Sequence, residues 1–287
     1  MAWPAARPLS VPPPDTTPAP GARPWHVFAT YVAAVAGIFV MTGVALEVLR
    51  SVYPDVPELT LVRTLPGLLA GSLAASIGLL LTLLLVVRPL EPGRLGLQPG
   101  RDTVSTLVAA VAGLRALGQA LDSLTVLLGL DARGSLQLIR RTLAGATGPD
   151  LFGAVVVLGV VAGTAEETFF RGYMQSRLRE HWRAPAAVGA TSASFAVLHV
   201  DVSAVHMVLA LALGLYLGFV AEATGSVLPC VVGHVANNIA YTLQTALGLT
   251  LTGREANWAA AVVGAGAFLG CVLWIRRAAA LPGRPAS

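Results

Sequence analysis

Lysine is absent from the 287-residue sequence, and charge of either sign is scarce. All 19 basic residues are arginines, and charged residues make up 12% of the chain, about half the share usual in soluble domains. Hydrophobic residues make up 55% and form runs long enough to cross a bilayer. This composition excludes an ordinary soluble domain. The net charge of +4 is better explained by loop arginines that fix membrane topology than by a nucleic-acid surface.

Cysteine is also scarce. Cys230 and Cys271 are the only two, and both lie in apolar runs. They offer neither a disulfide framework nor the spacing of a cysteine metal site.

Residues 1–24 hold eight prolines and almost no apolar periodicity, so we expect a disordered tail there. The folded part of the protein is therefore expected after residue 24.

Eight apolar segments predict an all-α, polytopic transmembrane bundle of about eight spans. The third is weakened by Arg115 and Gln119, and residues 122–149 alternate apolar and charged patches, as in a connecting segment with interfacial helices. The predicted spans cover residues 26–49, 65–87, 103–121, 151–166, 186–200, 204–221, 227–249 and 258–275.

Four parts of the chain follow from these segments. They are the proline-rich tail (1–24), the N-terminal spans with the connecting segment (25–149), a core rich in polar interruptions (150–250), and the last span with a basic C-terminal tail (251–287).

Arginine placement predicts the orientation of the chain. Eight spans put both termini on one side, and a cytoplasmic assignment places the loops at 88–101 and 177–183 and the tail after residue 275 inside, as the positive-inside rule favours. Arg133, Arg140 and Arg141 then fall outside, against the rule. We expect an integral protein of a bacterial inner membrane with both termini in the cytoplasm.

Glu166 and Glu167 close the apolar run that begins at Leu151, and Arg171 follows. Ionisable groups in a membrane segment are costly and are functional candidates by default. On a helix, Glu167 and Arg171 lie four residues apart, in the order that favours an ion pair. Glu166 points about 100° away. The pattern therefore predicts that Arg171 keeps Glu167 ionised and that Glu166 is available as a general base.

Two later apolar segments carry a histidine together with a second notable residue four positions away. Phe195 and His199 lie in one, while His234 and Asn238 lie four apart in the other and share a helix face, so that both could donate to one point. Taken singly, a lone histidine on an apolar helix is usually a packing residue, and a polar pair can bond a neighbouring helix. Together with Glu166, on three successive helices at comparable depth, they are better explained by one shared site.

Other polar residues receive no role from the sequence. His206 and Asp201 lie near a short outer loop, where an interfacial histidine is the ordinary explanation. Glu222 and Glu47 lie near span ends, where a carboxylate reaches the headgroups at little cost. The Gly-x3-Gly pattern at 214–218 permits close helix packing.

Three motifs stand in order over residues 150–245: EExxxR at 166–171, FxxxH at 195–199 and HxxxN at 234–238. In these motifs the chain resembles the CPBP family, the CAAX proteases and bacteriocin-processing membrane proteins. The first half of the chain is similar only in being a set of spans. The resemblance implies an intramembrane endopeptidase of the glutamic type acting on a membrane-associated protein or peptide.

The resemblance also implies roles for the motif residues. Glu166 would be the general base, and His199 would hold the water that Glu166 activates. His234 and Asn238 would form an oxyanion hole, which supplies donors where negative charge develops during amide hydrolysis. Three further residues would orient these groups: Glu167, Arg171 and Phe195.

Glu166, His199 and His234 also form a His2Glu set of the kind that binds zinc. HExxH is absent, and the motifs show no outer-shell carboxylate for either histidine. No cofactor is therefore expected, and zinc is the alternative.

Two other functions are compatible with the sequence. One is a non-catalytic membrane immunity or scaffold protein that uses the polar residues to bind a partner helix. The other is a proton-coupled transporter with Glu166, Glu167 and Arg171 as a relay, against which stands the lack of inverted repeats. The expected partners are a peptide or protein substrate and the lipid bilayer, with no nucleic acid.

Overall fold

The computed structural model describes residues 23–87, 92–100, 103–132, 134–201 and 203–280. Every regular element in these ranges is helical, which confirms the predicted all-α bundle. Most of the proline-rich tail, the end of the basic C-terminal tail, and Arg88, Arg101 and Arg133 lie outside the described residues.

The long and short helices are α1 (Pro24–Val52), α2 (Glu58–Leu61), α3 (Leu65–Val86), α4 (Val104–Leu127), α5 (Gly134–Leu143), α6 (Gly148–Ala154), α7 (Ala162–Glu167), α8 (Ser176–Arg179), α9 (Ala184–Val197), α10 (Val205–Thr224), α11 (Leu228–Ala246) and α12 (Arg254–Ala280). A 3-10 turn, η1 (Pro92–Leu95), and two π-helical segments, η2 (Val155–Val161) and η3 (Thr168–Gln175), complete the described elements.

A helix lies at each of the eight predicted spans. Within the described residues, six helices are long and apolar enough to cross a membrane: α1, α3, α4, the helix Gly148–Arg179, α10 and α12. With 14 residues, α9 is shorter than the roughly 20 that a bilayer needs. The polar residues of α11 keep it outside the six. The predicted spans that carry His199 and His234 are thus a short helix and a more polar one.

Proline and threonine mark the starts of the helices. Proline occupies the first or second position of α1, α3, α6, α9 and α11, where its missing N–H costs no hydrogen bond. The hydroxyls of Thr64 and Thr103 accept hydrogen bonds from the backbone N–H groups of Gly67 and Thr106 and so cap α3 and α4. Local sequence therefore sets these helix starts.

The helix that carries Glu166 is longer than predicted. It runs without a break over Gly148–Arg179, through α6, η2, α7, η3 and α8. The prediction that an arginine-rich loop follows directly after the fourth span is wrong about where the loop starts, because Arg177 still belongs to the helix. At 1.5 Å per residue, Glu166 lies about 27 Å from the start of the helix and about 20 Å from its end. The acidic pair is therefore deep within the bundle.

Arg171 and Gln175 hold this helix against α10. Arg171 Nη2 donates to the backbone oxygen of Gly214 at 3.0 Å, and Gln175 Nε2 donates to that of Gly218 at 3.1 Å. The missing side chains of the two glycines let these donors reach the α10 backbone. Both donors lie in the π-helical η3 and face α10.

Glu222 is not the headgroup-facing carboxylate expected near a span end. It is 4% exposed, and its two oxygens accept hydrogen bonds from Gln175 Nε2 and Arg179 Nε, both at 3.0 Å. The helix that continues to Arg179 covers Glu222 and supplies its partners. Glu47 does lie exposed near the end of α1, beside Arg50.

Residues 122–149, predicted as a connecting segment with interfacial helices, contain α5. The preceding helix α4 continues to Leu127, so the third span is longer than predicted. The apolar face of α5 packs against α3, α10 and α11. Arg140 of α5 forms an ion pair with Asp122 of α4 and donates from Nε to Tyr241 Oη of α11 at 3.3 Å. The connecting segment is thus anchored over one end of the bundle.

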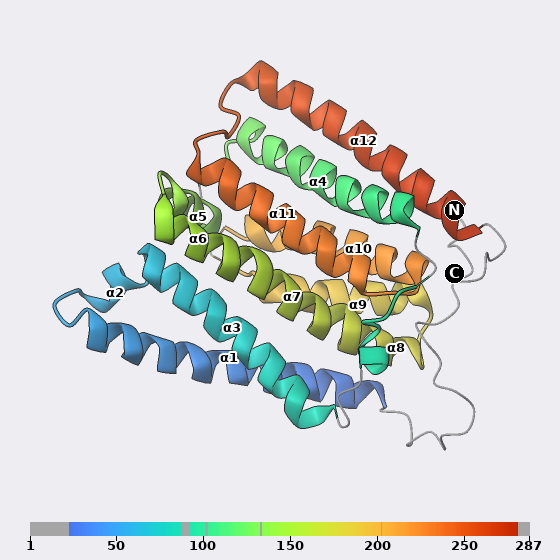
Figure 1. Cartoon of the computed structure of the whole chain (residues 1–287), viewed down its shortest axis with the longest axis horizontal. Coiled ribbons are helices and arrows are strands. Elements are labelled where there is room, and N and C mark those ends of the chain that lie inside the picture. Colours follow the sequence, from blue (N-terminus) through green and yellow to red (C-terminus); the bar gives the residue numbers. More distant parts are fainter. Residues whose placement is uncertain (1–22, 88–91, 101–102, 133, 202, 281–287) are drawn as a thin grey trace.

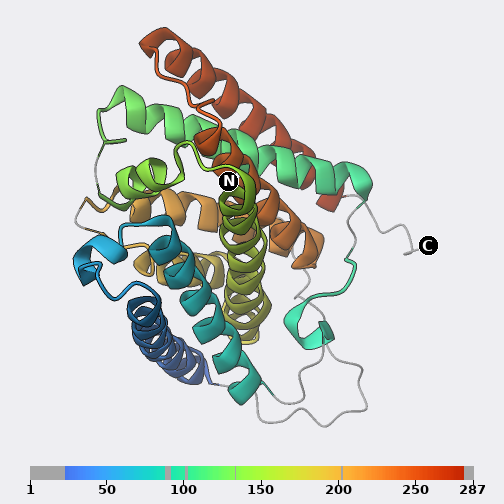
Figure 2. The ribbon, with the colours of Figure 1, turned by 60° about the vertical axis from the view of Figure 1, so that its left-hand side comes forward.

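Figure 1 shows the long helices running side by side, with α2, α5 and α6 at one end and α8 at the other. We call these the α5 end and the α8 end. Helix α4 packs on α12, α1 packs on α3, and the helix Gly148–Arg179 packs on α3 and α11. Figure 2 shows that last helix in the middle of the bundle. The helix that carries Glu166, Glu167 and Arg171 is therefore surrounded by other helices.

Candidate active site

Glu167 and Arg171 form the ion pair that their spacing predicts. Arg171 Nη1 lies 2.7 Å from Glu167 Oε1, and both side chains are fully buried. The guanidinium carbon also lies 5.0 Å from the centroid of the Phe195 ring, over its face. Buried charges need good partners to offset lost hydration, and the bond from Arg171 to Gly214 adds one. The pair joins α7, α9 and α10 at the site.

His234 extends this network from α11. Its Nδ1 lies 2.7 Å from Glu167 Oε1, the same oxygen that accepts from Arg171. Because an ionised carboxylate only accepts, Nδ1 carries a proton. The other ring nitrogen, Nε2, lies 3.7 Å from Glu166 Oε2. The two glutamates therefore face different edges of one imidazole.

This geometry corrects one interpretation of the sequence. The motifs show no outer-shell carboxylate for either histidine, but Glu167 is such a carboxylate for His234. The contact joins residues 67 positions apart, on separate helices, so no local spacing could reveal it.

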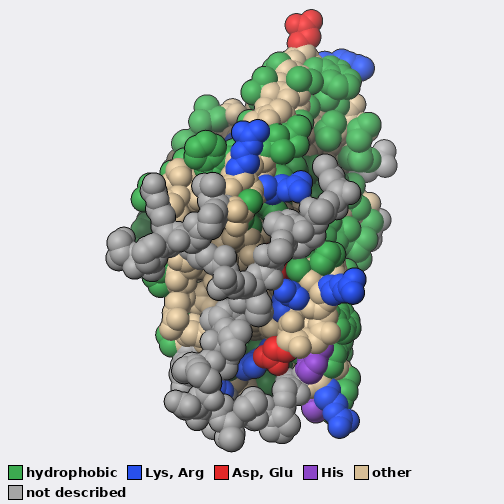
Figure 3. Space-filling view, turned by 90° about the vertical axis from the view of Figure 1, so that its right-hand side faces the viewer, with side chains coloured by type: hydrophobic (Ala, Val, Ile, Leu, Met, Phe, Trp, Pro, Cys, Tyr) green, Lys and Arg blue, Asp and Glu red, His purple; other side chains and the backbone are tan. Residues whose placement is uncertain are grey.

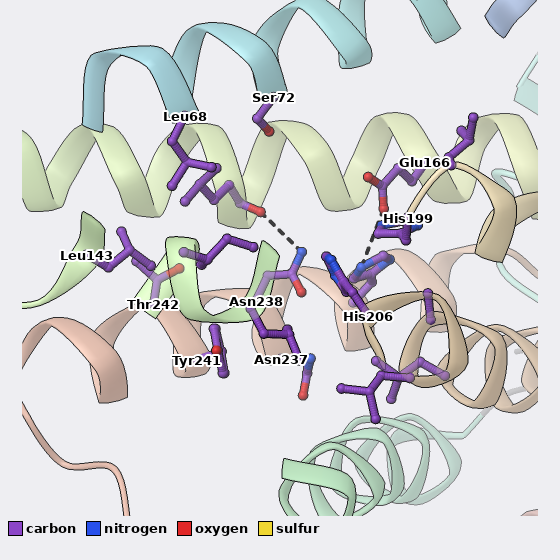
Figure 4. A pocket seen from close by; sticks show the side chains of 18 of the residues that line it. Leu68, Ser72, Leu143, Glu166, His199, His206, Asn237, Asn238, Tyr241 and Thr242 are labelled. Carbon is purple, nitrogen blue, oxygen red and sulfur yellow. Dashed lines mark hydrogen bonds and ion pairs between the residues drawn. The ribbon is translucent and has the colours of Figure 1, made fainter. Parts of the chain in front are cut away.

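Glu166 is the carboxylate that faces open space. Its side chain is 21% exposed, whereas that of Glu167 is 0% exposed. Figure 4 shows Glu166 at the same end of a cavity as His199 and His206. The separation of the two adjacent carboxylates, one buried in the ion pair and one directed elsewhere, is as predicted.

His199 lies just beyond the last turn of α9. Its Nδ1 lies 2.9 Å from the backbone oxygen of Phe195, and since a carbonyl only accepts, Nδ1 carries the proton and Nε2 of the neutral ring is an acceptor. The Phe195 ring centroid lies 4.6 Å from that of His199 and 6.1 Å from that of His234. Phe195 thus orients one histidine through its backbone and contacts both with its ring.

Asn238 lies one turn beyond His234 on α11. Its Nδ2 donates to the backbone oxygen of Leu158, in the π-helical η2, at 3.1 Å (Figure 4). The sequence predicts that both donors can reach one point, but Asn238 gives one amide hydrogen to this carbonyl and keeps only the second for another acceptor.

A cavity of about 610 Å³ adjoins these side chains. Its walls are mostly apolar and come from α1, α3, α4, α5, α10 and α11, and they extend from the middle of the bundle to the α5 end. An apolar cavity with a few convergent polar groups is the usual form of a binding site. Its polar lining residues include Glu166, His199, His206, His234, Asn237 and Asn238.

Glu166, His199 and His234 are the set that the sequence offers for zinc. In the ranges that the structure describes, no group of three His, Cys, Asp or Glu side chains is arranged to hold a metal ion. Glu166 Oε2 lies 3.7 Å from His234 Nε2, and the rings of both histidines lie against Phe195.

His206 is a residue of this cavity to which the sequence gave no role. Its ring centroid lies 4.8 Å from that of His199, and its Nδ1 lies 3.0 Å from Ser135 Oγ. The short loop between α9 and α10 was a signal that the two histidines lie close together. Ser135 stands 71 positions from His206, so its contribution could not be read from the sequence.

No curated protein and no solved structure matches the chain. Residues 148–240 match the family described as Rce1-like, type II CAAX prenyl endopeptidase. The matched segment begins with the helix Gly148–Arg179 and ends just past Asn238, so it contains all three motifs. The three motifs thus lie in a segment similar to the CAAX-type membrane endopeptidases, which confirms the resemblance to the CPBP family.

Proposed function

We propose that the protein is an intramembrane endopeptidase that hydrolyses a peptide bond in a membrane-associated protein or peptide. The family implies activity of the CAAX endopeptidase type. The observation that carries the proposal is the position of Glu166, open to an apolar cavity and 3.7 Å from His234. Glu167 is committed to Arg171 and His234, which makes Glu166 the carboxylate that can exchange a proton with bound water.

In the proposed reaction, Glu166 takes a proton from water as the water oxygen bonds to the peptide carbon. His199 holds that water through Nε2, the acceptor edge left by its bond to Phe195. The carbonyl oxygen becomes an oxyanion. When the C–N bond breaks, the electron pair goes to nitrogen and Glu166 returns the proton to the leaving amine. The cycle consumes one water and no net proton.

His234 and Asn238 are the proposed donors to the oxyanion. With Nδ1 committed to Glu167, His234 donates from Nε2 when both ring nitrogens carry protons. Asn238 has one amide hydrogen left after its bond to Leu158. Loss of one such donor typically lowers kcat about 100- to 1,000-fold. We expect Asn238→Ala to fall in that range.

We also propose that the reaction needs no metal. The described His, Cys, Asp and Glu side chains form no ligand group, and Glu166 is placed to act on water by itself. Activity that survives strong chelators in protein without stoichiometric zinc would support this proposal. Loss of activity on chelation, with recovery on adding zinc, would contradict it.

The arginines support an orientation with the α8 end in the cytoplasm of a bacterial inner membrane. Figure 3 looks onto that end and shows arginine side chains spread over it. The described arginines there are Arg23, Arg94, Arg177, Arg179, Arg183, Arg276 and Arg277. Fewer lie at the α5 end: Arg50, Arg63, Arg140, Arg141 and Arg254. Since the cavity extends to the α5 end, the substrate in this orientation enters from the non-cytoplasmic side.

Cysteine labelling in intact cells tests the orientation. Asp55 and Glu180 are exposed at the α5 end and the α8 end, respectively. In a chain whose Cys230 and Cys271 are replaced by alanine, a membrane-impermeant thiol reagent should label Asp55→Cys and not Glu180→Cys. The opposite pattern would reverse the orientation.

Glu166→Gln tests the catalytic proposal. The change keeps size and removes the base, so cleavage should fall at least about 100-fold, the low end of a general base's contribution. Membrane proteins of cells with the wild-type and Glu166→Gln forms are compared for species that persist uncleaved. Glu47→Gln, at an exposed carboxylate outside the cavity, is the matched control.

Equal processing by the folded Glu166→Gln and wild-type proteins would refute the endopeptidase proposal. It would favour a protein that binds a partner without cleaving it.

A further inference from the structure

Asp201, in the turn between α9 and α10, accepts four hydrogen bonds. Its Oδ2 accepts from the backbone N and from Oγ of Ser135, each at 2.7 Å. Its Oδ1 accepts from the backbone N and from Oγ of Ser203, at 2.9 and 2.8 Å. Burial raises the pKa of Asp201, but these hydrogen bonds outweigh burial and hold it below its ordinary value. An ionised Asp201 therefore ties the start of α5 to this turn.

Ser135 also contacts His206, because its Oγ lies 3.0 Å from His206 Nδ1. A hydroxyl has one proton, and Ser135 gives it to Asp201, whose carboxylate can only accept. Toward His206 the serine oxygen is then the acceptor, and His206 Nδ1 carries the proton. The chain Asp201–Ser135–His206 thus fixes the orientation and the tautomer of the His206 ring.

The approach of α5 to this turn depends on Gly134. Its φ is +59°, and a Cβ built on it would lie 2.3 Å from Asp201 Oδ2 and 2.5 Å from Ser203 Oγ. A side chain at this position would displace the start of α5. Because Gly134 has no side chain, Ser135 can approach Asp201 closely enough for the hydrogen bonds.

His206 in turn packs on His199. The two rings meet edge to face, with centroids 4.8 Å apart and planes at 73°. The Phe195 ring contacts His199 as well, at 4.6 Å. The bond from His199 Nδ1 to the Phe195 carbonyl leaves the imidazole able to tilt about that bond. The two ring contacts define its plane.

We propose that His206 is a positioning residue that holds the ring of His199, and that Asp201 orients His206 through Ser135. The inference rests on the proposed function, in which His199 holds the reacting water. Misplacement of a reacting group by about 1 Å can cost on the order of 100-fold in rate. His206, Ser135 and Asp201 all lie outside the three motifs, so the proposal adds a second set of residues to the site.

Two serine-to-alanine variants separate positioning from folding. Ser135→Ala and Ser203→Ala each remove one hydroxyl that donates to Asp201, but only Ser135 contacts His206. On the membrane protein that persists uncleaved in Glu166→Gln cells, we expect Ser135→Ala to lower kcat at least tenfold with KM within twofold, because the water is positioned in the transition state while the apolar cavity still binds substrate. Ser203→Ala should keep kcat within twofold. Ser135→Thr, which retains the hydroxyl, should recover most of the activity.

Equal kcat losses in Ser135→Ala and Ser203→Ala, or no rescue by Ser135→Thr, would overturn the proposal and assign Ser135 to folding alone. Wild type and Glu166→Gln are assayed alongside. If these two cleave equally, the proposed function has failed, whatever the serine variants do.

Chemical labelling tests the positioning without any cleavage. Diethyl pyrocarbonate acylates unprotonated imidazole nitrogen, and mass spectrometry of peptides reports the rate at His199 in the folded full-length protein. We expect that rate to rise at least threefold in Ser135→Ala and to stay unchanged in Ser203→Ala. An unchanged rate in Ser135→Ala would show that His206 does not hold His199, even if the protein is a protease.

Discussion

Replacement of Arg171 by methionine tests whether buried charge holds the site together. Glu167 Oε1 accepts from Arg171 and from His234, while Glu167 Oε2 is buried without a hydrogen-bond partner among the described residues. Methionine keeps much of the apolar volume beside Phe195 but leaves the carboxylate with one partner. Loss of one member of a buried pair costs about 3–5 kcal/mol.

That cost should be visible as a lower melting temperature. For a chain of this size, 1 kcal/mol corresponds to about 2–4 °C, so Arg171→Met should lower Tm by roughly 6–20 °C. Tryptophan fluorescence of the purified protein in detergent reports the transition. Arg50→Met is the matched control, because its pair with Glu47 is exposed and such pairs contribute at most about 1 kcal/mol.

A double-mutant cycle isolates the pair. Glu167→Gln removes the charge that Arg171→Met leaves uncompensated, so the double variant should regain about 2 kcal/mol over Arg171→Met. Losses that add to within about 0.5 kcal/mol would refute the argument, since independent sites behave that way. A Tm for Arg171→Met equal to that of Arg50→Met would refute it as well.

Three further changes test other parts of the structure. Asp201→Asn should lower Tm at pH 7, and the difference in Tm from wild type should narrow below about pH 4. The depressed pKa of Asp201 in the folded state gives stability that is present above the ordinary pKa and is lost as pH falls. A Tm difference that stays constant down to about pH 3 would contradict this. Gly134→Ala should cost more than the roughly 1 kcal/mol of a left-handed backbone alone, because the new Cβ meets Asp201; thermal unfolding against Gly129→Ala, also at positive φ but with open space around it, isolates the overlap. Glu222→Gln should lower Tm by several degrees because it leaves Arg179 short of its partly buried anion, and a change under 1 °C would argue against the buried pair.

Most of the helices could be predicted from the sequence, because they depend on local features. Apolar runs of membrane length gave the all-α bundle, and prolines and threonines mark the helix starts. The ion pair between Glu167 and Arg171 and the divergence of Glu166 follow from helical spacing alone. Both features depend on positions within one helix, so they can be predicted without knowing how the rest of the chain folds.

The helix boundaries around the site were harder to predict from the sequence. The stretch after Glu167 reads as a span end because arginines follow, yet the helix continues to Arg179. Buried partners on α10 make those polar residues compatible with a helix interior: Gly218 for Gln175 and Glu222 for Arg179. A span predicted from composition alone ends at charged residues, because it assumes that each charge must reach water.

The arrangement of the site was decided by tertiary structure. Glu167 is linked to His234, Asn238 to Leu158, and Ser135 to His206, across 67, 80 and 71 positions of sequence. Such contacts depend on which faces of distant helices meet. The helical period assigns each residue a face of its own helix but not the neighbour of that face. The sequence alone determined that two carboxylates, two histidines and an amide lie on successive apolar segments; packing decided that Glu166 opens to the cavity and that His206 lies against His199.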